Sequence, residues 1–101
     1  QDYVEAMWLM LQQEKPDDYV IATGVTHKVS EFVEAALSAA GLNGEIEEYV
    51  DFDKEMIRPS EVDLLVGDGT KARELLGWAP KTSFKELVAL MVENDLMAEN
   101  I

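Results

Sequence analysis

Apolar side chains recur at intervals of three and four residues in several segments of the chain, a spacing that predicts amphipathic helices. The first helix is expected over 2–13, before Lys15 and Pro16 break it. A second is expected between residues 29 and 40, where the apolar positions form one stripe, and Gly41 is well placed to end it. The first 41 residues are therefore expected to contain two helices.

Two further helices are expected nearer the C-terminus. Asp68 can cap a short helix that Gly77 ends. Ser83 and Glu86 have the spacing of a capping box, in which the hydroxyl and the carboxylate each accept a free backbone N–H. A longer amphipathic helix is expected to follow Ser83.

Two segments have the pattern of strands instead. Residues 19–23 form a short continuous apolar run that ends at Gly24, which is typical of a strand buried on both faces. Residues 46–52 show the alternation of an exposed or edge strand. Because a buried strand needs neighbours on both sides, the sequence predicts an α/β fold with helices packed on a small, partial sheet whose remaining strands are missing.

Charge narrows the classes of partner. The 101 residues include 8 Lys and Arg against 21 Asp and Glu, a net charge of −13, which disfavours nucleic acids and anionic membranes. No apolar run approaches the ~20 residues of a membrane span, and the lack of cysteine excludes disulfides and thiolate metal sites. We expect one domain over residues 1–101 of a soluble, cytoplasmic protein.

The start of the sequence indicates a piece of a longer protein. The chain opens on Gln1 rather than Met, and the first helical pattern begins there without a cap. A cut through the sheet would leave apolar surface on the first helix and on residues 19–23. We therefore expect pairing with itself, as a homo-oligomer joined through an exposed sheet or helix surface, or with a missing partner.

Most catalytic and metal signatures are excluded. His27 is the only histidine, so one chain cannot form a two-histidine zinc site, and its spacing to Ser30 is weak support for a nucleophile pair. The acidic run at 51–55 lacks the Gly and Glu that a calcium loop requires farther on. The loop 67–71 looks suited to phosphate but is too short for a P-loop, so helix capping is the favoured interpretation.

The segment around Arg58 carries the strongest binding signal. Arg58 is one of only 8 Lys and Arg residues and precedes the rigid Pro59 in an expected loop. A guanidinium suits bidentate contact with phosphate oxygens, and the carboxylate of Glu61 suits sugar hydroxyls. A structural Arg–Glu pair that locks the loop explains the same residues equally well. Residue chemistry alone leaves both interpretations open.

Six motifs occur in order along the chain: DYVEAMW at 2–8, DYVIATG at 18–24, EFVE at 31–34, RPSEVD at 58–63, GDGTKA at 67–72 and LGWAPK at 76–81. Each is modest alone, but the ordered set covers essentially the whole chain and resembles the C-terminal third of the GDP-mannose 4,6-dehydratase family. These are extended short-chain dehydrogenase/reductases. The resemblance implies a parent with a Rossmann domain for NADP, and it identifies this chain with the smaller C-terminal region that holds the nucleotide sugar.

The resemblance also implies a reaction for the intact enzyme. It oxidises C4 of the mannose with NADP, eliminates water across C5–C6 and returns the hydride to C6, giving GDP-4-keto-6-deoxymannose. The catalytic Tyr-x-x-x-Lys motif and the Gly-rich cofactor loop are not in this sequence. We therefore expect no catalytic, cofactor-binding or metal-binding residues in this chain, and no activity from it alone.

By the same resemblance, Arg58 matches the family arginine at the diphosphate and Glu61 the glutamate placed for the GDP ribose. The sequence departs from the family pattern in two places: residues 56–57 replace an aromatic pair, and Lys28 and Ser30 replace a serine and an arginine. A related epimerase or dehydratase acting on another sugar nucleotide therefore stays open. So does an acidic interaction or sugar-nucleotide-binding module without catalysis.

Overall fold

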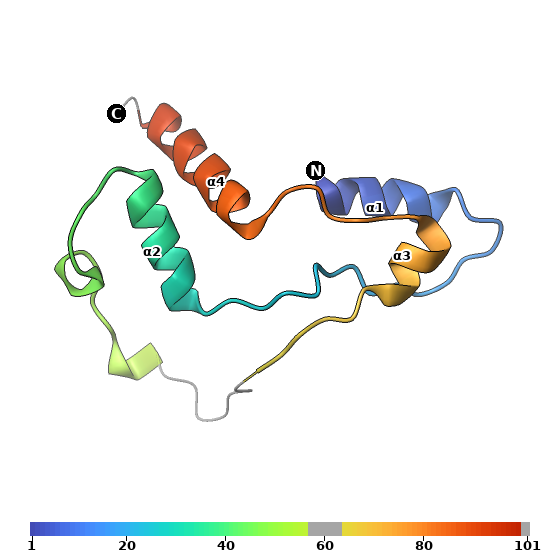
Figure 1. Ribbon diagram of the computed structural model, residues 1–101, viewed down its shortest axis with the longest axis horizontal. Helices are drawn as coiled ribbons and strands as arrows, with labels where there is room; N and C mark the ends of the chain where they lie inside the picture. Colours follow the sequence, from blue (N-terminus) through green and yellow to red (C-terminus); the bar gives the residue numbers. More distant parts are fainter. Residues whose placement is uncertain (57–63, 100–101) are drawn as a thin grey trace. The chain divides into compact units, whose positions relative to one another are not determined.

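The computed structural model describes residues 1–56 and 64–99. Within them the chain forms helices joined by irregular segments (Figure 1). These are α1 (Asp2–Leu11), α2 (Val29–Ala39), the 3₁₀ helices η1 (Ile46–Glu48) and η2 (Lys54–Met56), α3 (Thr70–Leu76) and α4 (Phe84–Ala98). They divide between two compact units. The first contains Gln1–Thr26 and Leu64–Ser83, and the described part of the second contains residues 27–56 and 84–99.

The predicted α/β fold is wrong for the part of the chain that the structure describes, which contains no strand. Residues 19–23 have no regular secondary structure, and the side chains of Tyr19 and Ile21 pack on the core of the first unit. A strand exists only through hydrogen bonds to a neighbouring strand, and these residues have none among those described. The apolar run therefore reflects partial burial of Tyr19 and Ile21 rather than strand pairing.

The second predicted strand, over 46–52, is replaced by η1. The backbone N–H of Tyr49 and that of Val50 both donate to the carbonyl of Ile46, at 3.0 and 2.9 Å. The Tyr49 hydroxyl donates to the carbonyl of Asn43 at 2.7 Å. These local bonds satisfy backbone groups that a sheet would otherwise have to satisfy.

The predicted stops at Gly41 and Gly77 are confirmed, whereas the first helix ends at Leu11, before the expected residue 13. Past the end of α2, Gly41 has φ +76°, and the N–H of Leu42 donates to the carbonyl of Leu37 at 2.9 Å, the bond of a Schellman motif. Gly77 ends α3 with φ +67°. Both positions use the left-handed conformation that glycine adopts without a Cβ clash.

The first unit has a small apolar core. There α1 packs against α3 (Figure 1). The largest buried side chain is that of Trp78, which is 1% exposed. The other buried core members are Ala6, Ala72 and Leu76, and the partly buried Leu9, Met10, Tyr19 and Ile21 pack around them. An indole of this size supplies much of the buried apolar area of the unit.

The second unit is built on the pair α2 and α4, which pack together (Figure 1). Val88 of α4 is fully buried, whereas α2 contributes no fully buried residue. A pair of helices with so little buried surface has an unfinished core. In residues 1–56 and 64–99, no helix has the length and apolar character that crossing a membrane would require.

Candidate functional site

The predicted site residues Arg58 and Glu61 lie outside the described residues. The pairing expected for them therefore remains a prediction from sequence. The described residues nonetheless decide what the other candidate groups do. Those groups are the loop 67–71, the acidic side chains at 51–55, and His27.

Lys71, the cation of the loop 67–71, is already bound within the first unit. Its ammonium lies 2.9 Å from a carboxylate oxygen of Asp17 and donates to the carbonyl of Asp18 at 2.8 Å. It also lies over the ring of Tyr19, 5.0 Å from the centroid. The hydrogen bond between the two charged groups lowers the pKa of Asp17 and raises that of Lys71. Lys71 thus fastens α3 to residues 17–19.

Asp68 lies just before α3 and binds the first residue of that helix, Thr70. Its Oδ1 accepts from the backbone N–H of Thr70 at 3.0 Å and from the Thr70 hydroxyl. Arg73 in turn donates to that hydroxyl oxygen at 3.2 Å. The two bonds from Thr70 lower the pKa of Asp68. The favoured interpretation of the loop as a helix cap holds only in part, because the N-cap of α3 is Gly69, without a side-chain cap bond, and Asp68 binds Thr70 from the position before it.

The two glycines of this loop are needed for close packing against Ala22. A Cβ added at Gly69 would lie 2.7 Å from the carbonyl oxygen of Ala22, and one at Gly67 would lie 2.6 Å from the Ala22 Cβ. Neither position has room for a side chain unless its neighbour moves. The loop is therefore shaped by contact with residues 20–22 of the same unit.

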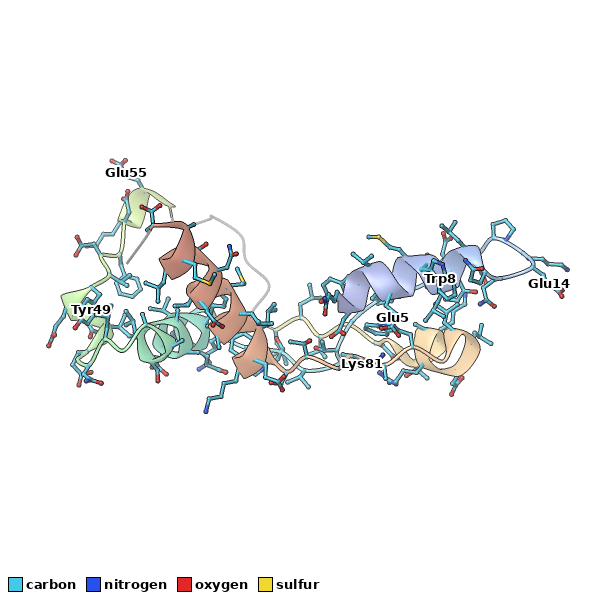
Figure 2. The ribbon with its side chains drawn as sticks, turned by 90° about the horizontal axis from the view of Figure 1, so that it is seen from above. Glu5, Trp8, Glu14, Tyr49, Glu55 and Lys81 are labelled. Atoms are coloured by element: carbon cyan, nitrogen blue, oxygen red, sulfur yellow. The ribbon has the colours of Figure 1, made fainter. Side chains whose placement is uncertain are left out.

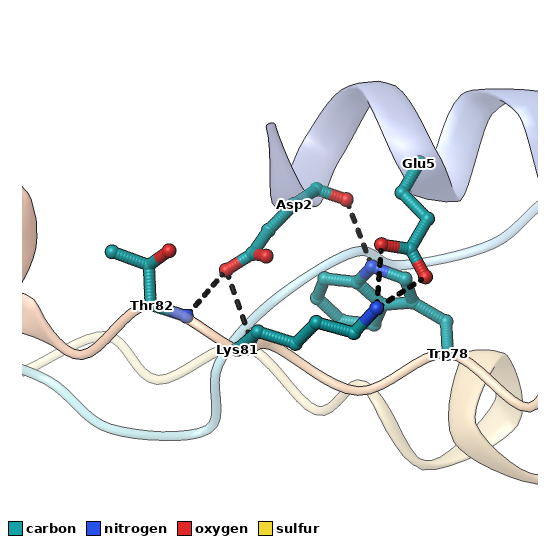
Figure 3. Close-up of polar contacts among 5 residues, drawn as sticks. All are labelled: Asp2, Glu5, Trp78, Lys81 and Thr82. Carbon is teal, nitrogen blue, oxygen red and sulfur yellow. Dashed lines mark hydrogen bonds and ion pairs between the residues drawn. The ribbon is translucent and has the colours of Figure 1, made fainter.

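A polar network that sequence reasoning missed joins α1 to the segment after α3 (Figure 3). The carbonyl of Asp2 accepts from the indole N–H of Trp78 at 2.8 Å. Its carboxylate accepts from the backbone N–H groups of Lys81 and Thr82 at 3.1 and 3.0 Å. The Lys81 ammonium lies beside Glu5, at 3.3 Å (Figure 2). A tryptophan beside a proline turn gives a weak signal of burial, but the sequence does not indicate an acceptor so far away.

His27 is held by packing at the start of the second unit. Its ring stacks on Phe84 with centroids 3.8 Å apart and planes 10° from parallel. Its Nδ1 lies 2.9 Å from a carboxylate oxygen of Glu31, and this hydrogen bond lowers the pKa of Glu31. The other oxygen of Glu31 accepts from the backbone N–H of Lys28 at 3.3 Å. His27 thus pairs with Glu31 and not with Ser30. His27 and Ser30 therefore do not form a nucleophile pair.

Across residues 1–56 and 64–99, no cluster of three His, Asp or Glu side chains is arranged to hold a metal ion. The acidic side chains at 51–55 are exposed. One of them, Asp53, accepts the backbone N–H of Glu55 at 2.9 Å.

Comparison with known proteins gives a consistent result. The family model described as GDP-mannose 4,6 dehydratase matches residues 1–91. The chain is 57% identical over 95 residues to GDP-mannose 4,6 dehydratase 1 of Arabidopsis thaliana, covering 94% of this chain and 26% of the relative. It is 52% identical to the Dictyostelium discoideum protein and 46% identical to the Homo sapiens protein of that name, each over 110 residues. These two alignments again cover 94% of this chain, and 31% and 30% of the relatives. The chain thus spans only about a quarter to a third of the length of these relatives.

Proposed function

The chain belongs to the GDP-mannose 4,6-dehydratase family, and from this membership we propose that residues 1–101 are the C-terminal, sugar-nucleotide-binding region of such an enzyme. The observation that carries the proposal is the family match over residues 1–91, together with relatives that bear the dehydratase name at 46–57% identity. Because these relatives are several times longer than the chain, the reaction is assigned to the parent protein and not to this piece.

The parent's proposed reaction is the conversion of GDP-mannose into GDP-4-keto-6-deoxymannose and water, with NADP as cofactor, in the cytoplasm. We assign the NADP site to the part of the parent outside this chain. Among the described residues, the loop suited to phosphate, 67–71, has its lysine bound to Asp17 and the backbone N–H of Thr70 donating to Asp68. The part assigned to this chain is therefore to bind and orient the sugar nucleotide.

We assign Arg58 to the diphosphate and Glu61 to the ribose of GDP. Arginine matches phosphate oxygens with two parallel donors, and a carboxylate accepts from vicinal hydroxyls. The engagement of Lys71 by Asp17 and Asp18 removes the cation of the rival loop. This supports Arg58 as the phosphate ligand, in agreement with the family motif RPSEVD at 58–63.

The predicted homo-oligomer is part of the same proposal, through a helix surface rather than a sheet. On α1, five apolar side chains are between 56% and 81% exposed: Tyr3, Val4, Met7, Trp8 and Leu11. A contiguous apolar face of this kind is typical of an interface.

Turnover tests the assignment of the reaction. The parent protein, extended to the family length, is incubated with GDP-mannose and NADP, and the product mass is measured. Loss of one water from GDP-mannose is expected, whereas the 101-residue chain under the same conditions is expected to give no product. An unchanged GDP-mannose pool with the folded parent would reject the dehydratase assignment. It would leave a sugar-nucleotide-binding module without catalysis.

A further inference from the structure

The second unit contains an open apolar groove between α2 and α4, with a volume of about 360 Å³. Val33 and Leu37 of α2 face Val92 and Leu96 of α4 across it, and Ala36 leaves space in its wall. These side chains are only half-buried in the structure. A groove this apolar is the surface against which a further element completes a core.

Two carboxylates give the groove its charge. Asp95 lies on α4 and Glu99 directly follows its last residue, so the two are four residues apart, and both line the same groove. Among the described residues, neither carboxylate has an ion pair. Like charges at this spacing repel each other by a few tenths of a kcal/mol on an isolated helix, and a cation placed between them relieves this repulsion.

The negative charge of the groove decides which kind of helix can bind in it. A second copy of the chain would bring its own Asp95 and Glu99 and a net charge of −13, so it is electrostatically mismatched with this groove. A basic amphipathic helix matches it: apolar side chains at positions i, i+3 and i+4 enter the groove, and a Lys or Arg beside them reaches the two carboxylates.

We propose that the groove between α2 and α4 docks a basic amphipathic helix supplied by the part of the parent dehydratase that lies outside this chain. The inference rests on the proposed function in one respect, namely that the chain is one part of a longer parent. The chain covers 26% of the length of the Arabidopsis relative, so most of such a parent is available to supply the helix. The unfinished core of the second unit is then completed within the parent.

Peptide binding to the 101-residue chain tests the proposal directly. The probes are peptides of about 20 residues, long enough for about five helical turns, tiled across the Arabidopsis relative outside its aligned region. Fluorescence anisotropy of each labelled peptide is measured against the chain. At least one peptide with a basic amphipathic pattern is expected to bind.

Matched variants locate the binding. Ala36→Trp fills the groove and is expected to weaken the peptide by about tenfold or more, whereas Ala39→Trp, on an exposed residue of α2 that does not line it, leaves the affinity unchanged. Asp95→Lys with Glu99→Lys is also expected to weaken binding and to reverse its salt dependence. The control is Glu93→Lys, on an exposed residue of α4 outside the groove.

Three outcomes would overturn the proposal: no peptide of the series binds, the groove variants bind as well as their controls, or the chain dimerises and only Ala36→Trp prevents it. The paired Lys substitutions are at exposed positions, so they keep the test decisive if Ala36→Trp disturbs folding, which circular dichroism reports. Because no sugar nucleotide or cofactor is present, the result is independent of the turnover assay. A parent without dehydratase activity leaves the docking result standing, and failed docking leaves the activity standing.

Discussion

The indole N–H of Trp78 donates to the backbone carbonyl of Asp2 at 2.8 Å, and this bond joins residues 76 positions apart in the chain. The indole itself is 1% exposed, so its N–H has no access to water and needs this acceptor. The carboxylate of Asp2 continues the connection by accepting from the backbone of Lys81 and Thr82 (Figure 3). The first residue of α1 thereby fixes the segment that follows α3.

Removing the indole donor should destabilise the first unit. Trp78→Phe keeps a buried ring but removes the indole N–H that donates to the carbonyl of Asp2 and leaves a smaller ring in the core, so a loss of about 1–3 kcal/mol is expected. Urea unfolding measures it. The control, Trp8→Phe, changes a side chain that is 60% exposed and should shift the free energy of unfolding by no more than about 0.5 kcal/mol. Equal effects of the two substitutions would contradict the assigned role.

The contact of the loop 67–71 with Ala22 predicts a specific rescue. Gly67→Ala places a Cβ against the Cβ of Ala22, and Gly69→Ala places one against the Ala22 carbonyl oxygen, so each should cost about 1–3 kcal/mol. Adding Ala22→Gly removes the first clash and leaves the second.

A double-mutant cycle on the urea midpoints measures this difference. The coupling between positions 67 and 22 should be about 1 kcal/mol, and that between 69 and 22 close to zero. Similar couplings in the two cycles would show that the loop does not pack on Ala22 as described.

The pair Asp17 and Lys71 predicts the pH dependence of stability. Folding lowers the pKa of Asp17 below its ordinary 3.8, so the contribution of the pair is present above that value and is lost as the pH falls through the lowered one. Folding raises the pKa of Lys71 above its ordinary 10.5, so the contribution is present below that value and is lost as the pH rises through the raised one.

Both groups are exposed, so the effect is small and weakens with added salt. Asp17→Asn should therefore flatten the acid limb of the curve of unfolding free energy against pH, measured at low ionic strength. Asp51→Asn, which changes an exposed carboxylate, serves as the control. An acid limb that is the same in wild type and Asp17→Asn would show that the pair does not form in solution.

The sequence could predict features that depend on neighbouring residues, and it could not predict those that depend on residues far apart in the chain. The stops at Gly41 and Gly77 depend on a few neighbouring residues, and the structure has both. A strand depends on a distant partner. The apolar run at 19–23 and the alternation at 46–52 therefore could not separate a strand from an irregular, partly buried segment or a 3₁₀ turn. The bond from Trp78 to Asp2 could not be predicted either, because these residues are far apart in the chain.

In the candidate site, too, local contacts could be predicted and distant ones could not. The sequence placed the loop 67–71 at a helix start, where Asp68 binds Thr70 two residues later, although the N-cap itself is Gly69. It did not indicate that Lys71 binds Asp17, more than fifty residues earlier. Arg58 and Glu61 were found through the motif RPSEVD, whose side chains suit phosphate oxygens and sugar hydroxyls. Their roles stay predictions that only ligand binding can test.

The most direct test of the sugar-nucleotide assignment is the affinity of the full-length parent for GDP, measured by calorimetry in wild type, Arg58→Ala and Arg73→Ala. Loss of a charge-assisted contact to the diphosphate predicts that Arg58→Ala weakens binding by about 1.5–3 kcal/mol. Arg73→Ala removes an equal charge from an exposed residue that bonds Thr70, and it should leave the affinity unchanged. Unchanged GDP affinity in Arg58→Ala, or an equal loss in both variants, would contradict the assignment.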